Sequence, residues 1–201
     1  LAVYVNAVFD DYSKYSGISC FLAGIFYSLQ IYGDFAGYSL MAIAVGQFFG
    51  FSLINNFERP YLADSVTNFW RRWHISLTRW LTSCIYIPLG GSRCSKIRQY
   101  WNIMVTFLVS GIWHGANWTF IVWGAFHGFL QIIEKILGID PKGKYAASVW
   151  LKRIKPFRIL LTFILVSFAW IVFRMPSIND SILFVNRMLT VQGDLYLPET
   201  W

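Results

Sequence analysis

Histidines within an apolar stretch are the first sign of chemistry in this sequence. Two of the three histidines, His114 and His127, lie in residues 110–128, a run without any acidic residue, lysine or arginine. Polar groups are costly inside a membrane, so a titratable residue in such a run indicates function. Histidine can also take and give a proton near neutral pH. We therefore expect a membrane enzyme with His114 at its centre.

The other two histidines lie in different surroundings. His127 follows His114 by 13 positions, which on one continuous helix would turn it about 220° away from His114. We therefore interpret His127 as structural, with a backbone carbonyl as its partner. His74 belongs to a separate stretch, residues 69–77, which also holds two tryptophans and two arginines.

The composition favours a chain solvated by lipid. The 201 residues are 56% hydrophobic and only 13% charged, whereas soluble domains carry about 25% charged residues. Apolar runs recur along the whole length, which excludes a cleaved signal peptide on a soluble body. The net charge of +7 comes from basic residues between those runs, where the positive-inside rule places them, and not from a nucleic-acid-binding stripe. The three cysteines lack the CxxC spacing, so neither a disulfide framework nor a metal site is predicted.

Two short apolar runs open the chain. Residues 18–32 and 40–54 hold about 15 residues each, fewer than the roughly 20 needed to cross a bilayer unaided. The segment 33–39 is predicted to break the helix between them, and it carries Asp34 and Tyr38.

An amphipathic helix is predicted from an N-cap at Asp64 to about Ser83. Apolar residues recur on it at i, i+3, i+4 and i+7, so that Trp70 and His74 share one face, while Arg72 lies on the other. This pattern is typical of a helix that lies along the membrane interface or packs on a bundle with one wet face.

Two later apolar runs, residues 101–113 and 118–133, lie between basic clusters at 93–98 and 142–158. Both clusters are expected on the cytoplasmic side, so the runs form a hairpin whose turn carries His114. The first run has about 13 residues, or roughly 20 Å of helix, which places the turn within the depth of the membrane. Irregular backbone is tolerated there only when it is buried or lines a cavity. We therefore expect a pocket at His114.

The last clear membrane run is residues 159–173, and residues 178–190 form a shorter helix. The elements together predict an all-α fold, a polytopic transmembrane helical bundle with short, tilted and interfacial helices. We treat residues 1–201 as a single membrane-embedded domain in the cytoplasmic membrane. Because the chain begins at Leu1 rather than Met and ends at Trp201, we expect a fragment, the C-terminal part of a longer chain whose N-terminal helices are absent.

Five stretches follow one another in a specific order: DFAGYS at 34–39, NFERPYL at 56–62, FWRRWHISL at 69–77, YIPLGGSR at 86–93 and GIWHGANW at 111–118. Together they resemble the membrane-bound O-acyltransferase family, and within it the branch of the bacterial alginate O-acetyltransferases. The resemblance covers about residues 30–175. A single Trp-His-Gly would be weak evidence, whereas the ordered set is specific.

The resemblance implies an enzyme that moves an acyl group, usually acetyl in this branch, from a cytoplasmic thioester to a hydroxyl. The donor would be acetyl-CoA or another phosphopantetheine thioester, and no bound cofactor is implied. The acceptor would be an extracytoplasmic polysaccharide, often reached through a periplasmic partner protein. The resemblance also implies a buried catalytic histidine at His114 and a second functional histidine at His74. The related branch that transfers D-alanine to teichoic acid has the same two histidines.

Acyl transfer requires a base, stabilisation of an oxyanion and two aligned substrates. A histidine base contributes about 10²–10⁴-fold, and we expect His114 to act in this way or to take the acyl group transiently as a nucleophile. His74 could orient the acceptor, hold the donor's carbonyl or donate toward the oxyanion. The alternative for each is a packing histidine, bonded to a backbone carbonyl or placed beside a tryptophan.

Further side chains are expected to complete the substrate site. Arg71 and Arg72 could bind the donor's phosphates or anionic lipid headgroups. Asn117 could fix the ring of His114 or cap the next helix, and Asp34 could meet a sugar hydroxyl or a partner, or cap the helix that follows it. The remaining expected contacts with substrate are Tyr38, Trp70 and Trp113.

Two other classes of protein remain open. A transporter or channel also places titratable groups near broken helices at mid-membrane. A haem-binding membrane protein could use two of the three histidines as axial ligands. Neither class explains why Arg-Arg-Trp-His and Trp-His-Gly-Ala-Asn-Trp occur together in this order.

Overall fold

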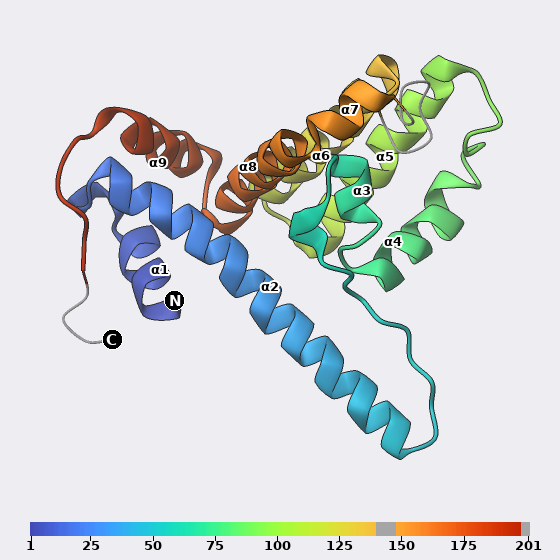
Figure 1. Ribbon diagram of the computed structural model, residues 1–201, viewed down its shortest axis with the longest axis horizontal. Coiled ribbons are helices and arrows are strands. Elements are labelled where there is room, and N and C mark those ends of the chain that lie inside the picture. The colour runs from blue at the N-terminus through green and yellow to red at the C-terminus, as the bar shows by residue number, and fades with distance from the viewer. Residues whose placement is uncertain (140–147, 198–201) are drawn as a thin grey trace.

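A computed structural model describes residues 1–139 and 148–197 (Figure 1). Over these residues the regular structure is helical throughout, as predicted. The helices are α1 Ala2–Asp10, α2 Gly17–Phe48, α3 Val66–Trp70, α4 Ile75–Leu81, α5 Lys96–His114, α6 Trp118–Leu137, α7 Val149–Arg153, α8 Lys155–Arg174 and α9 Ile178–Thr190, with 3₁₀ turns at Tyr12–Lys14 and Pro60–Leu62 and a π turn at Thr82–Tyr86. Three of them, α2, α6 and α8, are long and apolar enough to cross a membrane.

Helix α2 is continuous over 32 residues, so the predicted break at 33–39 is wrong. The two glycines of that segment, Gly33 and Gly37, lie in the helix with open space where a side chain would be. A glycine weakens a helix by about 0.5–1 kcal/mol relative to alanine, which is too little to interrupt a long apolar run without proline. At 1.5 Å per residue α2 is about 48 Å long, more than the roughly 30 Å hydrocarbon core of a bilayer.

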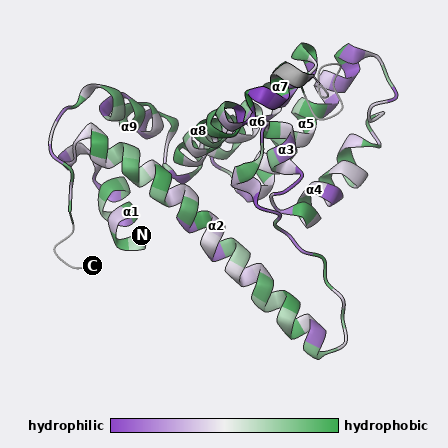
Figure 2. Ribbon diagram, viewed as in Figure 1, coloured by the Kyte–Doolittle hydropathy of each residue, from purple (hydrophilic) through white to green (hydrophobic). Residues whose placement is uncertain are grey.

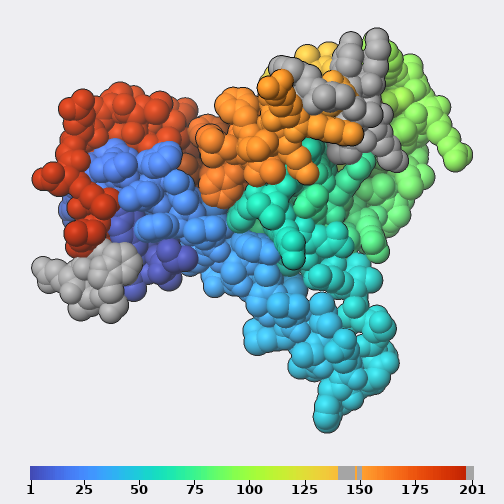
Figure 3. All heavy atoms as spheres, viewed as in Figure 1, coloured from blue at the N-terminus to red at the C-terminus, as the bar shows by residue number. Residues whose placement is uncertain are grey.

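The two halves of α2 have different surroundings (Figure 1). The N-terminal half packs against α1, α8 and α9, and Cys20, Ala23 and Tyr27 are buried there. The C-terminal half projects beyond the other helices (Figure 3) and is apolar along much of its length (Figure 2). Met41 and Val45 are among its exposed side chains. Such a surface is compatible with lipid or with further protein, and not with water.

The helix predicted to start at Asp64 is interrupted. Ser65, not Asp64, caps its first segment, because the Ser65 hydroxyl accepts a hydrogen bond from the amide of Asn68 at 3.0 Å. Helix α3 ends at Trp70, and α4 starts only after His74, whose backbone is left-handed with a φ of 43°. The continuous apolar face predicted to join Trp70 and His74 therefore does not exist.

The predicted hairpin is confirmed, with α5 and α6 antiparallel and joined by residues 115–117. The two backbones touch at glycines. A side chain at Gly111 would collide with the carbonyl oxygen of Phe120, and one at Gly124 with that of Phe107. Two glycines thus set the distance between the arms that flank the turn.

Helix α5 is longer than its apolar run. It begins after a cap in which the Ser95 hydroxyl accepts from the amide of Arg98, and it has 19 residues rather than about 13. At about 28 Å it nearly matches the hydrocarbon thickness of a bilayer. The added first turn is polar and basic, so the position of the hairpin turn within the depth of the membrane stays a prediction.

Described residues of the two predicted basic clusters lie at the open end of the hairpin. Arg93 lies just before α5, and Arg158 near the start of α8 donates to the carbonyl of Ile139, just after α6, at 3.4 Å. The two predicted basic clusters therefore share one end of the bundle. Residues 142–147 of the second cluster lie outside the described residues.

The core beside the hairpin is aromatic. Helix α8 packs against both α2 and α6. Its Trp170 ring lies 5.1 Å from that of Trp73 and 5.7 Å from that of Trp123, measured between ring centroids. This packing links Trp73, just before α4, to Trp123 of α6. Trp73 is next to His74 in the sequence, and the ring of Trp123 contacts that of His114, so these two histidines lie in the same region.

Candidate active site

Two of the three histidines, 40 positions apart, meet at one tryptophan. The ring centroid of Trp113 lies 4.9 Å from that of His114 and 6.5 Å from that of His74. His114 is the last residue of α5, and His74 immediately precedes α4. The sequence-based prediction of a pair formed by His74 and His114 is therefore compatible with the geometry of the fold.

The turn that carries His74 is held by Asn56. The amide of Ile75 donates to the carbonyl of Asn56 at 3.0 Å, and the amide and hydroxyl of Ser76 donate to Asn56 Oδ1 at 3.1 and 2.7 Å. A left-handed backbone is unfavourable for a residue other than glycine, so it persists only where its surroundings enforce it. Phe35 of α2 packs edge-on against the His74 ring at 4.7 Å.

His74 is neutral at pH 7. Burial, with a smaller contribution from the charge of His114, lowers the pKa of His74 to about 4 from its ordinary value of 6.5. The physical cause is that a partly apolar site disfavours the charged imidazolium. A neutral imidazole has one N–H donor and one acceptor nitrogen.

The hydrogen bonds indicate which nitrogen of His74 carries the proton. The Ser76 hydroxyl has one proton, which it donates to Asn56 Oδ1. Its oxygen, 3.4 Å from His74 Nδ1, can therefore only accept. The proton of neutral His74 then lies on Nδ1, and Nε2 presents a lone pair.

His114 is half-buried in an aromatic setting. Trp123 of α6 and Phe173 of α8 present their rings edge-on to it at 5.2 and 5.0 Å. Within the described part of the chain, neither ring nitrogen has a hydrogen-bond partner. His114 can therefore exchange a proton with a substrate without first breaking an internal bond.

A cavity of about 770 Å³ extends along α5. Its lining includes Thr78 and Ser110, each four residues, about one helical turn, from a histidine of the pair. Arg71, Arg93 and Lys135 contribute positive charge to its wall. Neither histidine lines this cavity, so the pocket expected at His114 stays a prediction. The cations of the cavity suit a phosphate-bearing ligand.

The other expected site residues lie on several elements, and for two of them the structure decides between the predicted roles. Asp34 and Tyr38 are exposed on α2, so Asp34 caps no helix. Arg72 is half-buried and donates through Nε to Asn68 Oδ1 at 3.1 Å. Asn117 caps α6 by accepting from the amide of Thr119 at 3.2 Å, and it does not contact His114 through that oxygen.

The partner of His127, the third histidine, is a side chain. His127 is fully buried, and its Nδ1 accepts from Trp70 Nε1 at 3.2 Å. The prediction that its partner is a backbone carbonyl is wrong. Trp70, expected to contact substrate, has its indole nitrogen engaged inside the core, although the residue also lines the cavity.

Three residues near the site were missed. Phe35 follows Asp34 directly, and the predicted break at this point hid its helical position against His74. Asn56 belongs to a recognised stretch, but nothing in its spacing pairs it with residue 76. Glu134 closes an apolar run, and its burial could not be inferred because its partners are 67 and 68 residues away.

Comparison with known proteins gives a consistent result. A family model described as MBOAT, membrane-bound O-acyltransferase family, matches residues 7–178. The probable alginate O-acetylase of Azotobacter vinelandii is 47% identical over 158 residues, covering 79% of this chain and 30% of that protein. Its counterpart from Pseudomonas syringae pv. tomato is 46% identical over 199 residues, covering 99% of this chain and 36% of that protein. The peptidoglycan O-acetyltransferase of Helicobacter pylori is 37% identical over 192 residues, with 96% and 36% covered.

The chain spans about a third of the length of these curated relatives, from 30% to 36%. The family model nevertheless covers most of the chain, from α1 to the first residue of α9. The match includes both histidines of the pair and the cavity beside them. The chain belongs to the membrane-bound O-acyltransferase family.

Proposed function

We propose that the complete protein is an O-acyltransferase of the cytoplasmic membrane. It moves an acyl group, acetyl in the first instance, from a cytoplasmic thioester to a hydroxyl of a cell-envelope polysaccharide. The observation that carries this proposal is the meeting of His74 and His114 at the Trp113 ring. Family membership and the names of the relatives support it.

His114 is the general base of the proposed reaction. It takes the proton of the acceptor hydroxyl while the oxygen attacks the thioester carbonyl, which gives a tetrahedral intermediate with an oxyanion. Collapse of the intermediate breaks the carbon–sulfur bond, and the leaving thiolate takes the proton from the imidazolium, which restores neutral His114. A positioned histidine base contributes about 10²–10⁴-fold to such a reaction.

His74 orients the acceptor. The one proton of the reacting hydroxyl goes to His114, so with its own proton on Nδ1 His74 can accept through Nε2 from a neighbouring hydroxyl of the acceptor, but it cannot donate to an oxyanion. We propose Trp113 as the residue that donates a hydrogen bond to the oxyanion. Its indole N–H can only donate, and its ring packs against both histidines.

The cavity along α5 is the proposed donor site. Arg71, Arg93 and Lys135 offer charge for the phosphates of acetyl-CoA or of a phosphopantetheine carrier. The basic end of the hairpin would face the cytoplasm by the positive-inside rule. On the projecting half of α2, Asp34 and Tyr38 remain proposed contacts with the acceptor or with a polysaccharide-acetylation partner.

The acetyl ester content of the cell-surface glycan tests the proposal. Three strains are compared: one with the complete gene, one with His114→Ala at matched membrane abundance, and one with the gene deleted. We expect ester only with the intact gene. D-alanyl ester is measured in the same samples, because the related reaction shares the histidine chemistry. Equal amounts of both esters in all three strains would refute the proposed activity.

A further inference from the structure

Glu134 is the one buried carboxylate in the described ranges, and the proposed chemistry does not use it. It lies near the end of α6 and is 9% exposed. Its two oxygens accept hydrogen bonds from the amides of Val66 and Thr67, at 2.5 and 2.9 Å. These are the first two residues of α3. Bonds between a carboxylate and amides are charge-assisted and stronger than neutral ones.

A second contact fastens the other end of α3 to the same helix. Trp70, the last residue of α3, donates its indole N–H to His127 Nδ1 at 3.2 Å. Phe69 stacks on the His127 ring with an interplanar angle of 7°. Glu134 follows His127 by seven positions, about two helical turns, so both side chains project from one face of α6.

Helix α3 depends on such contacts. It has five residues, far fewer than the roughly 12–15 that an isolated helix needs to be even marginally stable in water. Its first amides would lack partners within the helix, and Glu134 supplies them. The orientation of α3 is therefore set by α6 rather than by its own sequence.

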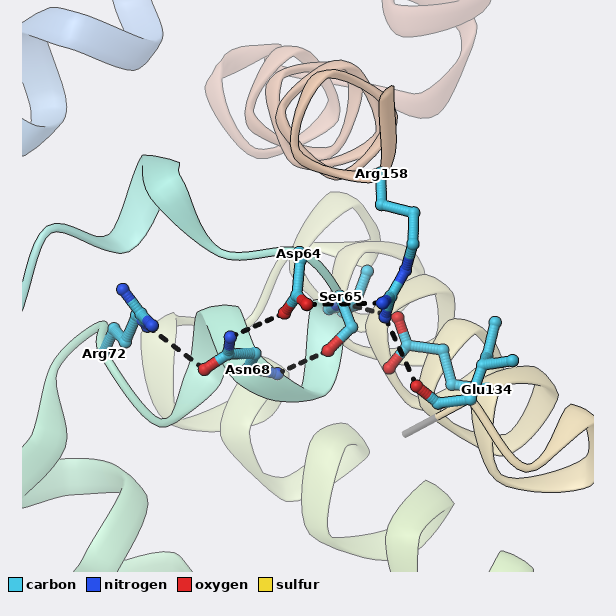
Figure 4. Close-up of polar contacts among 8 residues, drawn as sticks. Asp64, Ser65, Asn68, Arg72, Glu134 and Arg158 are labelled. Carbon is cyan, nitrogen blue, oxygen red and sulfur yellow. Dashed lines mark hydrogen bonds and ion pairs between the residues drawn. The ribbon is translucent and has the colours of Figure 1, made fainter. Parts of the chain in front are cut away.

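A chain of polar contacts also runs along α3 (Figure 4). Arg158 of α8 pairs with Asp64 at 3.3 Å, and Asp64 accepts from the side chain of Asn68 at 2.7 Å. Asn68 in turn accepts from Arg72 at 3.1 Å. The same helix is thus tied to α8, but through partly exposed groups, which contribute less than buried ones.

Both histidines of the pair then take their positions from α6. His114 is joined to it by three residues. Trp70 precedes His74 by four positions, and between them Trp73 is buried and stacks on Phe69 at 5.5 Å. A displacement of α3 would therefore move His74 relative to His114.

We propose that Glu134 and His127 are positioning residues, which hold α3 on α6 and so fix the distance between His74 and His114. This inference rests on the proposed function, because it assigns a catalytic purpose to that distance. A displacement of about 1 Å in reacting groups can cost about a hundredfold in rate. Glu134 and His127 would thus affect the rate of transfer without touching either substrate.

The test uses the complete protein in membranes, with variants that remove the contacts in steps. Glu134→Ala removes both acceptors, and Glu134→Gln retains one oxygen. His127→Leu removes the acceptor for Trp70, whereas His127→Asn offers an oxygen near the position of Nδ1. Glu58→Gln is the matched control, because that side chain is exposed. Hydrogen–deuterium exchange over residues 66–76 and steady-state kinetics are measured for each protein.

We expect Glu134→Ala to speed exchange over residues 66–76 and to lower kcat by about ten- to a hundredfold. The KM for the acceptor should change by less than about threefold, because no acceptor contact is lost. The KM for the donor is not used as a criterion, because Arg71, which follows α3, lines the proposed donor cavity. Glu134→Gln should lie between Glu134→Ala and the parent, and His127→Asn should recover activity lost in His127→Leu. A contact that merely stabilises the fold would lower the melting temperature and leave kcat unchanged.

Two results for Glu134→Ala would overturn the inference. One is unchanged exchange over residues 66–76, and the other is faster exchange combined with a kcat equal to that of the control variant Glu58→Gln. His114→Ala is measured in parallel. If that variant kept the parental rate, the proposed function would fail at His114. The exchange data would still decide independently whether Glu134 holds α3.

Discussion

His114 and His74 both lie near Trp113, but different kinds of contact hold the two histidines in place. His114 ends a helix whose position is set by backbone contact within one hairpin, at Gly111 and Gly124. His74 lies in a left-handed turn that is held by hydrogen bonds from Ile75 and Ser76 to Asn56, a residue 18 positions before His74. His114 is held by close backbone packing, which two glycines without side chains allow. His74 is held by hydrogen bonds to a residue distant in the sequence, and two of these bonds use the side chain of Asn56.

Because of this difference, substitutions near the two histidines should have different consequences, either loss of folded protein or a lower rate of transfer. Close backbone packing cannot be loosened gradually, so damage to the hairpin should remove folded protein. A turn held by a few hydrogen bonds of about 1 kcal/mol each can shift while the bundle stays intact. Substitutions around His74 should therefore lower the rate of transfer before they lower the amount of protein.

The largest effect is expected from Gly124→Val. Its side chain would collide with the carbonyl of Phe107, and overpacking of this kind costs about 1–3 kcal/mol or more. We expect little folded protein, measured as membrane abundance and as a monodisperse peak after detergent extraction. A well-folded variant with parental abundance would show that the hairpin is less tightly packed than described.

Asn56→Asp should change the pH dependence rather than the fold. A carboxylate beside Ser76 favours the charged imidazolium, so the pKa of His74 should rise from about 4. The active form is neutral His74, and its fraction falls as the pH drops below that pKa. The acid limb of kcat should therefore move to higher pH. Asn56→Ala, the control, should lower kcat at every pH without moving the limb. An unmoved limb in Asn56→Asp would contradict the proposed coupling of Asn56 to His74 through Ser76.

Trp70→Phe removes the bond to His127, and a double-mutant cycle separates that bond from packing. An aromatic ring remains, but the indole N–H and part of the buried volume are lost, so the cost of about 1–3 kcal/mol from the unsatisfied acceptor adds to a cavity cost. The double variant Trp70→Phe/His127→Leu should be less destabilised than the sum of the two single variants, because neither partner is then stranded. Thermal unfolding of the four proteins in detergent measures this coupling, and strict additivity would show that the bond contributes nothing.

Gly37→Ala is expected to have the smallest effect and the opposite sign. The position has open space in a continuous helix, so alanine should stabilise α2 by about 0.5–1 kcal/mol. The melting temperature should rise slightly with unchanged activity. A clear loss of folded protein would indicate that α2 bends or packs closely at this point.

The sequence was sufficient where structure is local. The hairpin, α8 and α9 follow from apolar runs bounded by polar turns, and so does the position of His114 at the end of α5. The capping role of Asn117 was one of two alternatives, and the structure selects it. Each of these inferences required only residues within one or two helical turns.

The sequence was insufficient where distant segments decide. The interruption between α3 and α4 is imposed by residue 56, and no periodicity in residues 64–83 reveals it. The break predicted at Asp34 overestimated the effect of glycine in an apolar helix. The partner of His127 and the burial of Glu134 depend on α3 lying against α6, which only the fold provides.

Acetyl transfer by the purified complete protein tests the central claim most directly. Release of thiol from acetyl-CoA is followed in the presence of deacetylated envelope polysaccharide, for the parent and for His114→Ala of equal thermal stability. We predict that kcat/KM falls by about 10²–10⁴-fold in the variant, with acetyl ester formed only by the parent. Equal rates of ester formation by the two proteins would contradict a catalytic role for His114.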